Sequence, residues 1–451
     1  MVREAIMNKG GIMQPTSYTD EQIVQTSGLF VPCVRRWFSD EPVLFVEARG
    51  AVLVDSKGRE YLDLLSSHGC ATLLGYNHPA VVEAIREQVG RLYAVSVEFP
   101  TPPVVELAEK LIEATPEVLD TVYFANAGAE AVEVVLFLAK KHTGRSELVS
   151  LYGDFHGRTH GARSLLGYAP LKKGMGPYLP GVTRIPSYYC YRCQLGLSYP
   201  SCELQCAKLL EDTLLYGTAG EVAVFVAEPI QGTAGNIPAP DGYFQEIKRI
   251  LDKYGILLFI DEIYTSFGST GKKFCFEHYH ILPDFLTMSK TLGNGLPISA
   301  VLTRKEIAGS FAPPEPPLYF TTFGSNPLMA AAALASLKVI LQEKPWERAA
   351  ALGEYWMRGL KKLQDKHEII GDVRGKGVMI GVELVRDRKT KEPATAESLK
   401  LKIEAGKRGL ILPAGQGWLG NTIRMNPSVV MTEAQIDQAL DILDQSLTAI
   451  R

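Results

Sequence analysis

The chain has 451 residues, of which 46% are hydrophobic and 22% charged, a balance typical of a folded globular protein and not of a disordered one. This length exceeds what a single ordinary core needs, so we expect a large domain with at least one smaller one. The formal net charge of -3 argues against nucleic acid as a partner, and no run reaches the roughly 20 apolar residues that span a bilayer, so we expect a cytoplasmic protein that does not bind membranes.

The first predicted element is a β-hairpin. Residues 50–63 read Gly-Ala-Val-Leu-Val-Asp-Ser-Lys-Gly-Arg-Glu-Tyr-Leu-Asp, in which two short apolar stretches flank a Ser-Lys-Gly turn at residues 56–58. A turn of this composition between two short strands is typical of a hairpin.

The middle of the chain predicts a mostly parallel β-sheet. Between residues 119 and 305, short apolar runs alternate with helical patterns such as those at residues 130–141 and 243–253. Runs that are apolar on both faces and separated by amphipathic segments indicate a parallel sheet covered by helices, which is an α/β layer structure. The apolar runs are residues 121–125, 222–226, 256–260, 285–288 and 298–302.

The last part of the chain predicts a smaller α+β domain. It begins with an alanine-rich helical pattern, continues through the strand-like residues 381–385 and ends in an amphipathic helix at residues 433–447. The expected units are an N-terminal segment at residues 1–80, a large domain at residues 81–330 and a small C-terminal domain at residues 331–451.

Two predicted strands end where a ligand would lie in an open α/β sheet, beyond the carboxyl ends of the strands. After the run at residues 121–125, small residues lead into a helix, and this turn suits a phosphate or simply allows close packing. Asp261 directly follows another apolar run, so its charge needs a cationic partner. A protonated ring nitrogen is one such partner, and a salt bridge or a helix cap would also serve.

Lys290 follows a third run. Residues 284–290 read Asp-Phe-Leu-Thr-Met-Ser-Lys, and the glycine-rich turn Thr-Leu-Gly-Asn-Gly-Leu-Pro comes next. An amine whose pKa is lowered by burial or by nearby positive charge is able to form a Schiff base with a carbonyl group. A lysine between an apolar run and such a turn is therefore a candidate nucleophile, although a lone lysine is usually a surface residue.

Together these motifs resemble the class III aminotransferases, which are pyridoxal-phosphate enzymes of fold type I. The most specific pieces are Asp-Glu-Ile at residues 261–263 and Ser-Lys-Thr-Leu-Gly-Asn-Gly-Leu-Pro at residues 289–297. The resemblance extends from the hairpin and residues 74–79 to Asn-Thr-Ile-Arg-Met-Asn-Pro at residues 421–427. It implies that the large domain binds pyridoxal 5'-phosphate and that the N-terminal segment packs with the small domain.

The resemblance also implies roles around the cofactor. Lys290 would form the Schiff base with the cofactor and move a proton to and from the substrate α-carbon. Asp261 would hold the ring nitrogen protonated, which makes the ring an electron sink. Gly128 and Ala129 resemble the residues around the phosphate, and Thr322 resembles the threonine that reaches this phosphate from the neighbouring subunit. The site would then need a homodimer, alone or within a tetramer.

Further residues resemble those that surround the ring and the substrate. Phe155 matches the aromatic side chain stacked on one face of the ring and Ile263 the branched side chain on the other, and His156 is expected beside the cofactor. Glu228 resembles the glutamate that orients groups on the substrate side. Arg424 matches the arginine that binds a substrate carboxylate, a task that suits the planar guanidinium group. Without the resemblance, Phe155 and Ile263 would be ordinary core residues, and Arg424 would be a helix-capping or salt-bridged arginine.

Two features depart from the family pattern. Tyr264 stands where the family often has a glutamine near the phenolic oxygen of the cofactor, and it would still offer a hydroxyl group there. Ser266 and Ser269 stand in a turn where Gly-Phe-Gly-Arg is common. Any substrate contact made by that arginine is therefore in doubt for this chain.

Four of the seven cysteines form two close pairs, with eight residues between the pairs: Cys190, Cys193, Cys202 and Cys206. Four thiolates at this spacing are able to hold zinc in a closed tetrahedral site. Two disulfides or four free thiols are also compatible with the sequence, and a protein with a large core does not need a structural metal.

The expected reaction is the transfer of an amino group from an amine or ω-amino acid to a 2-oxo acid such as pyruvate or 2-oxoglutarate. Ser67, His68 and Cys70 occupy the stretch that lines the substrate pocket in relatives, and no arginine among them would hold a distal carboxylate. An amino-acid racemase or epimerase and a dialkylglycine decarboxylase use the same lysine and aspartate, so they remain alternatives, although Phe155 stands where the decarboxylase would have tryptophan. A catalytically silent cofactor-binding protein would need no such lysine and aspartate together.

Overall fold

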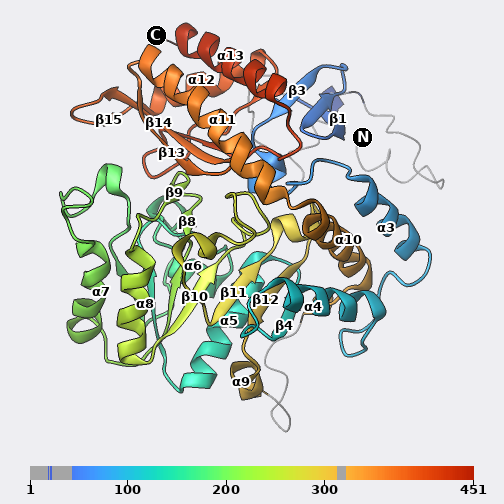
Figure 1. Cartoon of the computed structure of the whole chain (residues 1–451), viewed down its shortest axis with the longest axis vertical. Helices are drawn as coiled ribbons and strands as arrows, with labels where there is room; N and C mark the ends of the chain where they lie inside the picture. Colours follow the sequence, from blue (N-terminus) through green and yellow to red (C-terminus); the bar gives the residue numbers. More distant parts are fainter. Residues whose placement is uncertain (1–18, 20, 23–42, 312–320, 451) are drawn as a thin grey trace.

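A computed structural model of the chain describes residues 19, 21–22, 43–311 and 321–450, and it is built around a seven-stranded sheet (Figure 1). The strand order is β4, β12, β11, β10, β7, β5, β6. Every neighbouring pair is parallel except the two made by β12, which runs antiparallel to β11 and β4. The predicted mostly parallel sheet is therefore confirmed. Its strands are β4 (Thr121–Ala125), β5 (Glu147–Leu151), β6 (Val182–Ile185), β7 (Val222–Ala227), β10 (Leu257–Asp261), β11 (Phe285–Met288) and β12 (Ser299–Thr303).

Apolar side chains pack on both faces of this sheet. Along β10, Leu258 and Ile260 belong to one hydrophobic cluster, and Leu257 and Phe259 belong to another. β7 and β10 are buried along their whole length, as central strands of a parallel sheet are. The helices of this part are α3 (Pro79–Val89), α4 (Pro102–Ala114), α5 (Gly128–Thr143), α6 (His160–Leu165), α7 (Gln205–Tyr216), α8 (Tyr243–Tyr254), α9 (Lys305–Ala308) and α10 (Pro327–Glu343).

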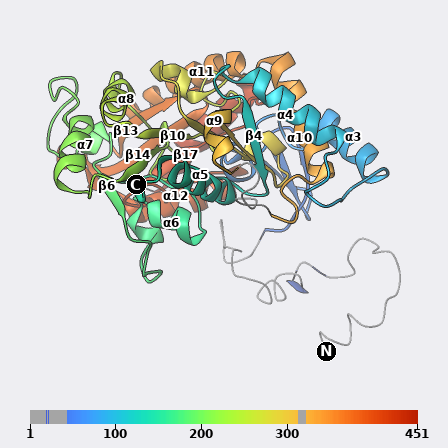
Figure 2. The same cartoon turned by 90° about the horizontal axis from the view of Figure 1, so that it is seen from below.

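Two groups of helices lie at opposite ends of the sheet, and α5 lies between them. α3, α4 and α10 pack together at one end of the molecule, and α7 and α8 pack together at the other (Figure 1 and Figure 2). α5 packs against β11 and β12 between them. It ends at Thr143 and is followed by Gly144, whose φ of 68° favours glycine. α10 begins after Asn326, whose side chain accepts hydrogen bonds from backbone N–H groups of the first turn.

The C-terminal part is a smaller α+β unit with a hydrophobic cluster of its own, which includes Trp356, Ile380 and Leu443. β14 pairs antiparallel with β13, β15 and β17. The predicted final helix is α13, whose first turn is closed by a capping box between Thr432 and Gln435. The elements are α11 (Pro345–Lys366), β13 (Ile370–Lys376), β14 (Met379–Asp387), β15 (Glu392–Pro393), α12 (Thr395–Lys407), β17 (Thr422–Met425) and α13 (Glu433–Ala449).

The predicted hairpin is formed by β2 and β3, which pair antiparallel on either side of residues 56–58. β1 pairs with β2, and β16, from the C-terminal part, pairs parallel with β3. Leu62 and Leu73 also belong to the same hydrophobic cluster as Trp356. The domain boundaries at residues 80 and 330 stay predictions. The strands here are β1 (Phe45–Arg49), β2 (Val52–Asp55), β3 (Glu60–Asp63) and β16 (Leu410–Ile411), and a separate ribbon consists of β8 (Ile230–Gln231) and β9 (Ile237–Pro238).

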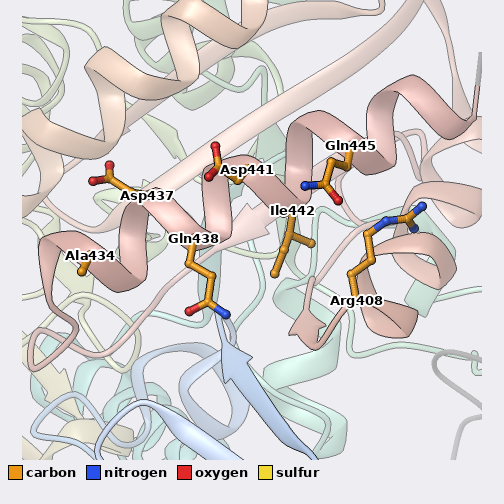
Figure 3. Close-up of a pocket in the computed structure, with 7 residues that line it drawn as sticks. All are labelled: Arg408, Ala434, Asp437, Gln438, Asp441, Ile442 and Gln445. Carbon is orange, nitrogen blue, oxygen red and sulfur yellow. The ribbon is translucent and has the colours of Figure 1, made fainter.

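A surface hollow of about 710 Å³ lies between α13 and Arg408 (Figure 3). None of the residues predicted to bind cofactor or substrate lines it. Its lining side chains are Arg408, Ala434, Asp437, Gln438, Asp441, Ile442 and Gln445. As for membranes, none of the helices in the described ranges combines the length and apolar character needed to cross a bilayer.

Candidate active site

The carboxyl ends of β10 and β11 place Asp261 and Lys290 at the same edge of the sheet. In this parallel pair Asp261 lies opposite Thr287, and Thr287 Oγ1 donates a hydrogen bond to Asp261 Oδ1 over 3.0 Å. β11 ends at Met288, and Lys290 opens the short 3-10 helix Lys290–Gly293 immediately after it. Side chains from two separate strands therefore meet where a ligand of an α/β sheet lies.

Asp261 is 3% exposed, and its carboxylate is held by hydrogen bonds. Ile263 N–H donates to Oδ1 over 3.1 Å, and His156 Nδ1 lies 2.8 Å from Oδ2. His156 Nε2 lies 3.5 Å from Asp154 Oδ2, so the imidazole bridges two carboxylates. Burial opposes a charge on this imidazole, but the neighbouring carboxyl groups of Asp154 and Asp261 outweigh it and raise the pKa of His156 to about 10. The resulting imidazolium is in direct contact with the Asp261 carboxyl group.

Lys290 has a left-handed backbone conformation and an amine of lowered pKa. Its φ of 37° lies in the left-handed region, which is rare for residues other than glycine and is often found at functional sites. Its Nζ lies 4.4 Å from the centroid of the Tyr264 ring. Desolvation by the surrounding protein and the positive charge of Arg424 lower the pKa of Lys290 to about 8. About half of the amine is therefore unprotonated, and so nucleophilic, at pH 8.

Gly128 and Ala129 open α5 just beyond β4. A Cβ at Gly128 would lie 2.7 Å from the Ile263 side chain, and a Cβ at Gly157 would lie 2.5 Å from the Ala129 Cβ. The β4–α5 turn therefore touches both Ile263 and the turn at residues 153–157, and only small residues permit this approach. A close-packed glycine turn at the N-terminus of a helix suits a phosphate.

Thr322 is exposed and lies in an irregular segment before α10. The preceding residue, Thr321, accepts a hydrogen bond from Asn126 Nδ2 over 2.7 Å, so the segment lies beside the β4–α5 turn of its own chain. The next side chain, Phe323, is 62% exposed. An exposed threonine and an exposed aromatic ring next to this turn suit a contact with a second subunit.

Phe155 and Glu228 are linked by a hydrogen bond. The backbone N–H of Phe155 donates to Glu228 Oε2 over 2.8 Å, and Gly232 N–H donates to Oε1 over 3.2 Å. Burial raises the pKa of Glu228, and the negative charge of Asp154 adds to this increase. Glu228 therefore fixes the turn that carries Phe155, whose side chain is half-buried.

Arg424 lies on β17 and reaches the site from the C-terminal part of the chain. Its side chain is 5% exposed, its Cζ lies 5.3 Å from the centroid of the Tyr264 ring, and its Nε has no hydrogen-bond partner among the residues that the structure describes. The guanidinium and Lys290 Nζ thus both lie against one ring. A buried guanidinium with an unused donor suits a carboxylate ligand.

The three residues expected on the donor side lie in a tight turn. Ser67 and Cys70 have φ values of 64° and 59°, again in the left-handed region. Ser67 and His68 are exposed, whereas Cys70 is completely buried, which raises the pKa of its thiol to about 12. Thr291 Oγ1 donates to the Cys70 carbonyl oxygen over 2.6 Å, so this turn is tied to the residue next to Lys290.

Most of the chain matches one enzyme family. The family model described as Aminotransferase class-III matches residues 35–447. The chain belongs to the class III aminotransferases. Among relatives of known name, it is 38% identical over 437 residues to the leucine/methionine racemase of Thermococcus litoralis, a match that covers 95% of this chain and 96% of the racemase.

Solved structures show the same class III aminotransferase fold. An (S)-enantioselective ω-transaminase from Thermomicrobium roseum superposes with a TM-score of 0.89 at 31% identity, covering 96% of this chain and 99% of that one. An amine transaminase from an uncultivated Pseudomonas species, solved in a PLP-bound form, superposes with a TM-score of 0.86 at 26% identity, covering 91% and 96%. The fold type I assignment is therefore confirmed, and the relatives include both transaminases and a racemase.

The cofactor of the class III aminotransferases is pyridoxal 5'-phosphate, and the residues at the sheet edge fit it. Lys290 offers an amine of lowered pKa to an aldehyde, and Asp261 offers a carboxylate to a ring nitrogen. Gly128 opens α5 in close contact with Ile263, where a Cβ would clash, and the N-terminus of this helix suits the phosphate. These individual roles remain predictions from the resemblance.

Two buried polar residues of this class III site were not singled out from the sequence. Gln231 Nε2 donates to Asp154 Oδ1 over 2.6 Å, and both side chains are fully buried behind His156. Asp154 follows a strand of the sheet, β5, just as Asp261 follows β10, so the same strand-end rule would have found it. It was missed because β5 contains a glutamate and a serine and therefore does not appear as an apolar run in the sequence.

Of the four clustered cysteines, Cys190, Cys193 and Cys202 lie between β6 and α7 and Cys206 lies in the first turn of α7, and none of them forms a disulfide. In the described part of the chain, no three Cys, His, Asp or Glu side chains are arranged to hold a metal ion. Their segment is attached to the C-terminal part by hydrogen bonds from Tyr189 and Arg192 to Glu383. The zinc site and its two alternatives stay predictions.

The lowered pKa of Lys290 predicts how cofactor binding depends on pH. Only the unprotonated amine attacks an aldehyde, so the rate at which the apoprotein binds pyridoxal phosphate should rise with pH and level off above about 8. A lysine of ordinary pKa would keep the rate rising to about 10.4. Stopped-flow absorbance at constant ionic strength measures this rate, and an increase of about fivefold or more between pH 9 and 10 would contradict the expected environment of Lys290.

Proposed function

We propose that this class III enzyme is an aminotransferase that moves an amino group from an amine or ω-amino acid to a 2-oxo acid such as pyruvate or 2-oxoglutarate. The observation that carries the proposal is the meeting of Lys290 and Arg424 against the Tyr264 ring, at 4.4 and 5.3 Å from its centroid. An amine that binds the cofactor and moves protons thereby lies next to a group that binds a carboxylate. This is the pair that a reaction on an oxo acid needs.

Each residue has a distinct task in this proposal. Bound pyridoxal phosphate supplies an electron sink, which weakens a bond at the substrate α-carbon. Lys290 Nζ takes a proton from that carbon or returns it, a task for which a pKa of about 8 is suitable. Asp261, supported by the imidazolium of His156, keeps the ring nitrogen of the cofactor protonated. Arg424 orients the oxo acid through its carboxylate.

The donor side favours an amine or an ω-amino acid. Ser67, His68 and Cys70 line the expected donor side, and none is a guanidinium that would seize a second carboxylate. Cys70 is buried with a neutral thiol, so it adds no charge to this side. The proposal therefore assigns the carboxylate site at Arg424 mainly to the oxo acid.

The proposed enzyme is a homodimer, on its own or within a tetramer. Thr322 and Phe323 are exposed beside the β4–α5 turn, where the phosphate is expected. In a dimer Thr322 would reach the phosphate bound by the partner chain. A site completed by two chains would be active only at protein concentrations at which the dimer persists.

Racemisation of an amino acid is the second candidate. The observation that favours it is the 38% identity with the leucine/methionine racemase, over almost the full length of both chains. A racemase uses the same lysine and aspartate to remove a proton from the α-carbon, but returns it to the other face of that carbon. Arg424 would then hold the carboxylate of the amino acid.

Single enantiomers of leucine, each incubated with and without pyruvate, distinguish the two reactions. Transamination predicts that the amino acid or a plain amine is consumed only with the oxo acid. Racemisation predicts the opposite enantiomer without any oxo acid, which chiral chromatography detects. The proposed function fails if the enzyme rapidly converts one enantiomer into the other without pyruvate and transfers nitrogen from no amine to pyruvate.

A further inference from the structure

Tyr264 is wedged between two glycines at the centre of the site. A Cβ at Gly69 would lie 2.0 Å from the Tyr264 ring, and a Cβ at Gly232 would lie 2.7 Å from it. Both approaches are closer than any real Cβ contact, so the ring fills all the space between these two backbone segments. The ring is therefore held in one position, and its hydroxyl group points to a fixed place.

The hydroxyl group of Tyr264 is a buried donor. Neither this hydroxyl nor Arg424 Nε makes a hydrogen bond of good geometry within the described ranges, and the nearby Asn426 side chain acts on the pKa of the hydroxyl. Arg424 Cζ lies 5.3 Å from the centroid of the Tyr264 ring, so the guanidinium lies beside this side chain. Burial raises the pKa of Tyr264, so the hydroxyl keeps its proton. A buried donor without an acceptor is unfavourable, and two such donors near each other suit one ligand with two acceptor atoms.

We propose that Tyr264 binds the substrate carboxylate together with Arg424, its hydroxyl donating one hydrogen bond while the guanidinium neutralises the charge. This inference rests on the proposed function and names the substrate class of that site, since it favours substrates with an α-carboxylate over plain amines at this position. A carboxylate supplies the acceptors that both donors lack. Tyr264 is thus a substrate-binding residue in place of the glutamine common at this position.

Tyr264→Phe tests the inference, because it removes the hydroxyl and keeps the wedged ring. In the holoenzyme, we expect the KM for pyruvate and the Kd for propanoate, an unreactive carboxylate, each to rise about tenfold through loss of a hydrogen bond to a charged group. The KM for 2-aminopropane, which carries a methyl in place of the carboxylate of alanine, should change less than about twofold.

Tyr243→Phe is the matched control. The Tyr243 hydroxyl is also buried without a partner in the described structure, but Tyr243 lies on α8 and its ring packs in the core against Tyr188. This variant should leave all three constants unchanged. A similar loss in both variants would show a general effect of buried hydroxyls and overturn the inference.

Two other outcomes of Tyr264→Phe overturn the inference. Equal increases in the KM values for pyruvate and 2-aminopropane would show a merely structural role. A shift in the pH titration of the cofactor absorbance with unchanged propanoate binding would place the hydroxyl on the cofactor. Propanoate binding requires no reaction, so a tenfold loss of it supports the inference even if the wild-type enzyme proves not to transaminate. If Tyr264→Phe binds propanoate normally and still transaminates, the inference about Tyr264 is wrong but the proposed function stands.

Discussion

Lys290→Ala should abolish turnover and the absorbance band of the lysine-bound cofactor. The substitution removes both the covalent attachment of the cofactor and the group that moves the proton, and a general base alone is worth about 10² to 10⁴ in rate. Steady-state assays with an amine and pyruvate, together with absorbance spectra of the purified protein, measure both losses. Lys253→Ala is a suitable control, because Lys253 lies on α8, is 56% exposed and pairs only with Glu211 among the described charges.

Retention of turnover by Lys290→Ala would remove the assignment of this lysine. Loss of turnover with an unchanged cofactor band would mean that another lysine holds the cofactor and that Lys290 acts only on the substrate. Equal losses in Lys253→Ala would point to general destabilisation.

Asp261→Asn should lower kcat about 10²- to 10³-fold while the protein still folds. The amide keeps the size of the carboxylate but loses the charge that holds a proton on the ring nitrogen, and loss of one pre-organised charge-stabilising contact in a buried site has an effect of this size. Steady-state kinetics measure kcat, and thermal unfolding reports on the fold. The expected fall in kcat is larger than any fall in cofactor affinity.

Asp284→Asn is the matched control for this prediction. Asp284 lies at the opposite end of the same strand pair, where it accepts a hydrogen bond from Leu258 N–H and pairs with Arg304. This variant should reduce stability by about 1 kcal/mol and leave kcat within about twofold. A kcat of Asp261→Asn within threefold of the wild type would contradict the proposed role of Asp261.

The large sheet and its strand-end residues were predictable from the sequence, because central parallel strands are apolar on both faces. That pattern identified β7, β10 and β11, and with them Asp261 and Lys290. It missed β5 and β6, whose runs contain polar side chains such as Ser150 and Arg184. Ser150 is buried because its hydroxyl donates to the Leu165 carbonyl oxygen, a tertiary contact that no local pattern reveals.

The rest of the site depends on contacts between distant parts of the chain. Arg424 reaches Tyr264 because β17 pairs with β14, and only the family resemblance had singled it out. The bridge from Asp154 through His156 to Asp261 joins two strand ends about a hundred residues apart in the sequence. The Tyr264 ring likewise lies between Gly69 and Gly232, which brings together three segments that are far apart in the sequence. Periodicity and spacing carry no information on such contacts.

Reduction of the holoenzyme with sodium borohydride, followed by peptide mapping by mass spectrometry, tests most directly whether Lys290 carries the cofactor. Reduction makes the bond between lysine and cofactor permanent, so the modified residue is read from the peptide that gains the mass of the cofactor. We predict a single modified peptide with the added mass on Lys290. A cofactor attached to a different lysine, or no attachment in a protein that contains the cofactor, would contradict the proposed site.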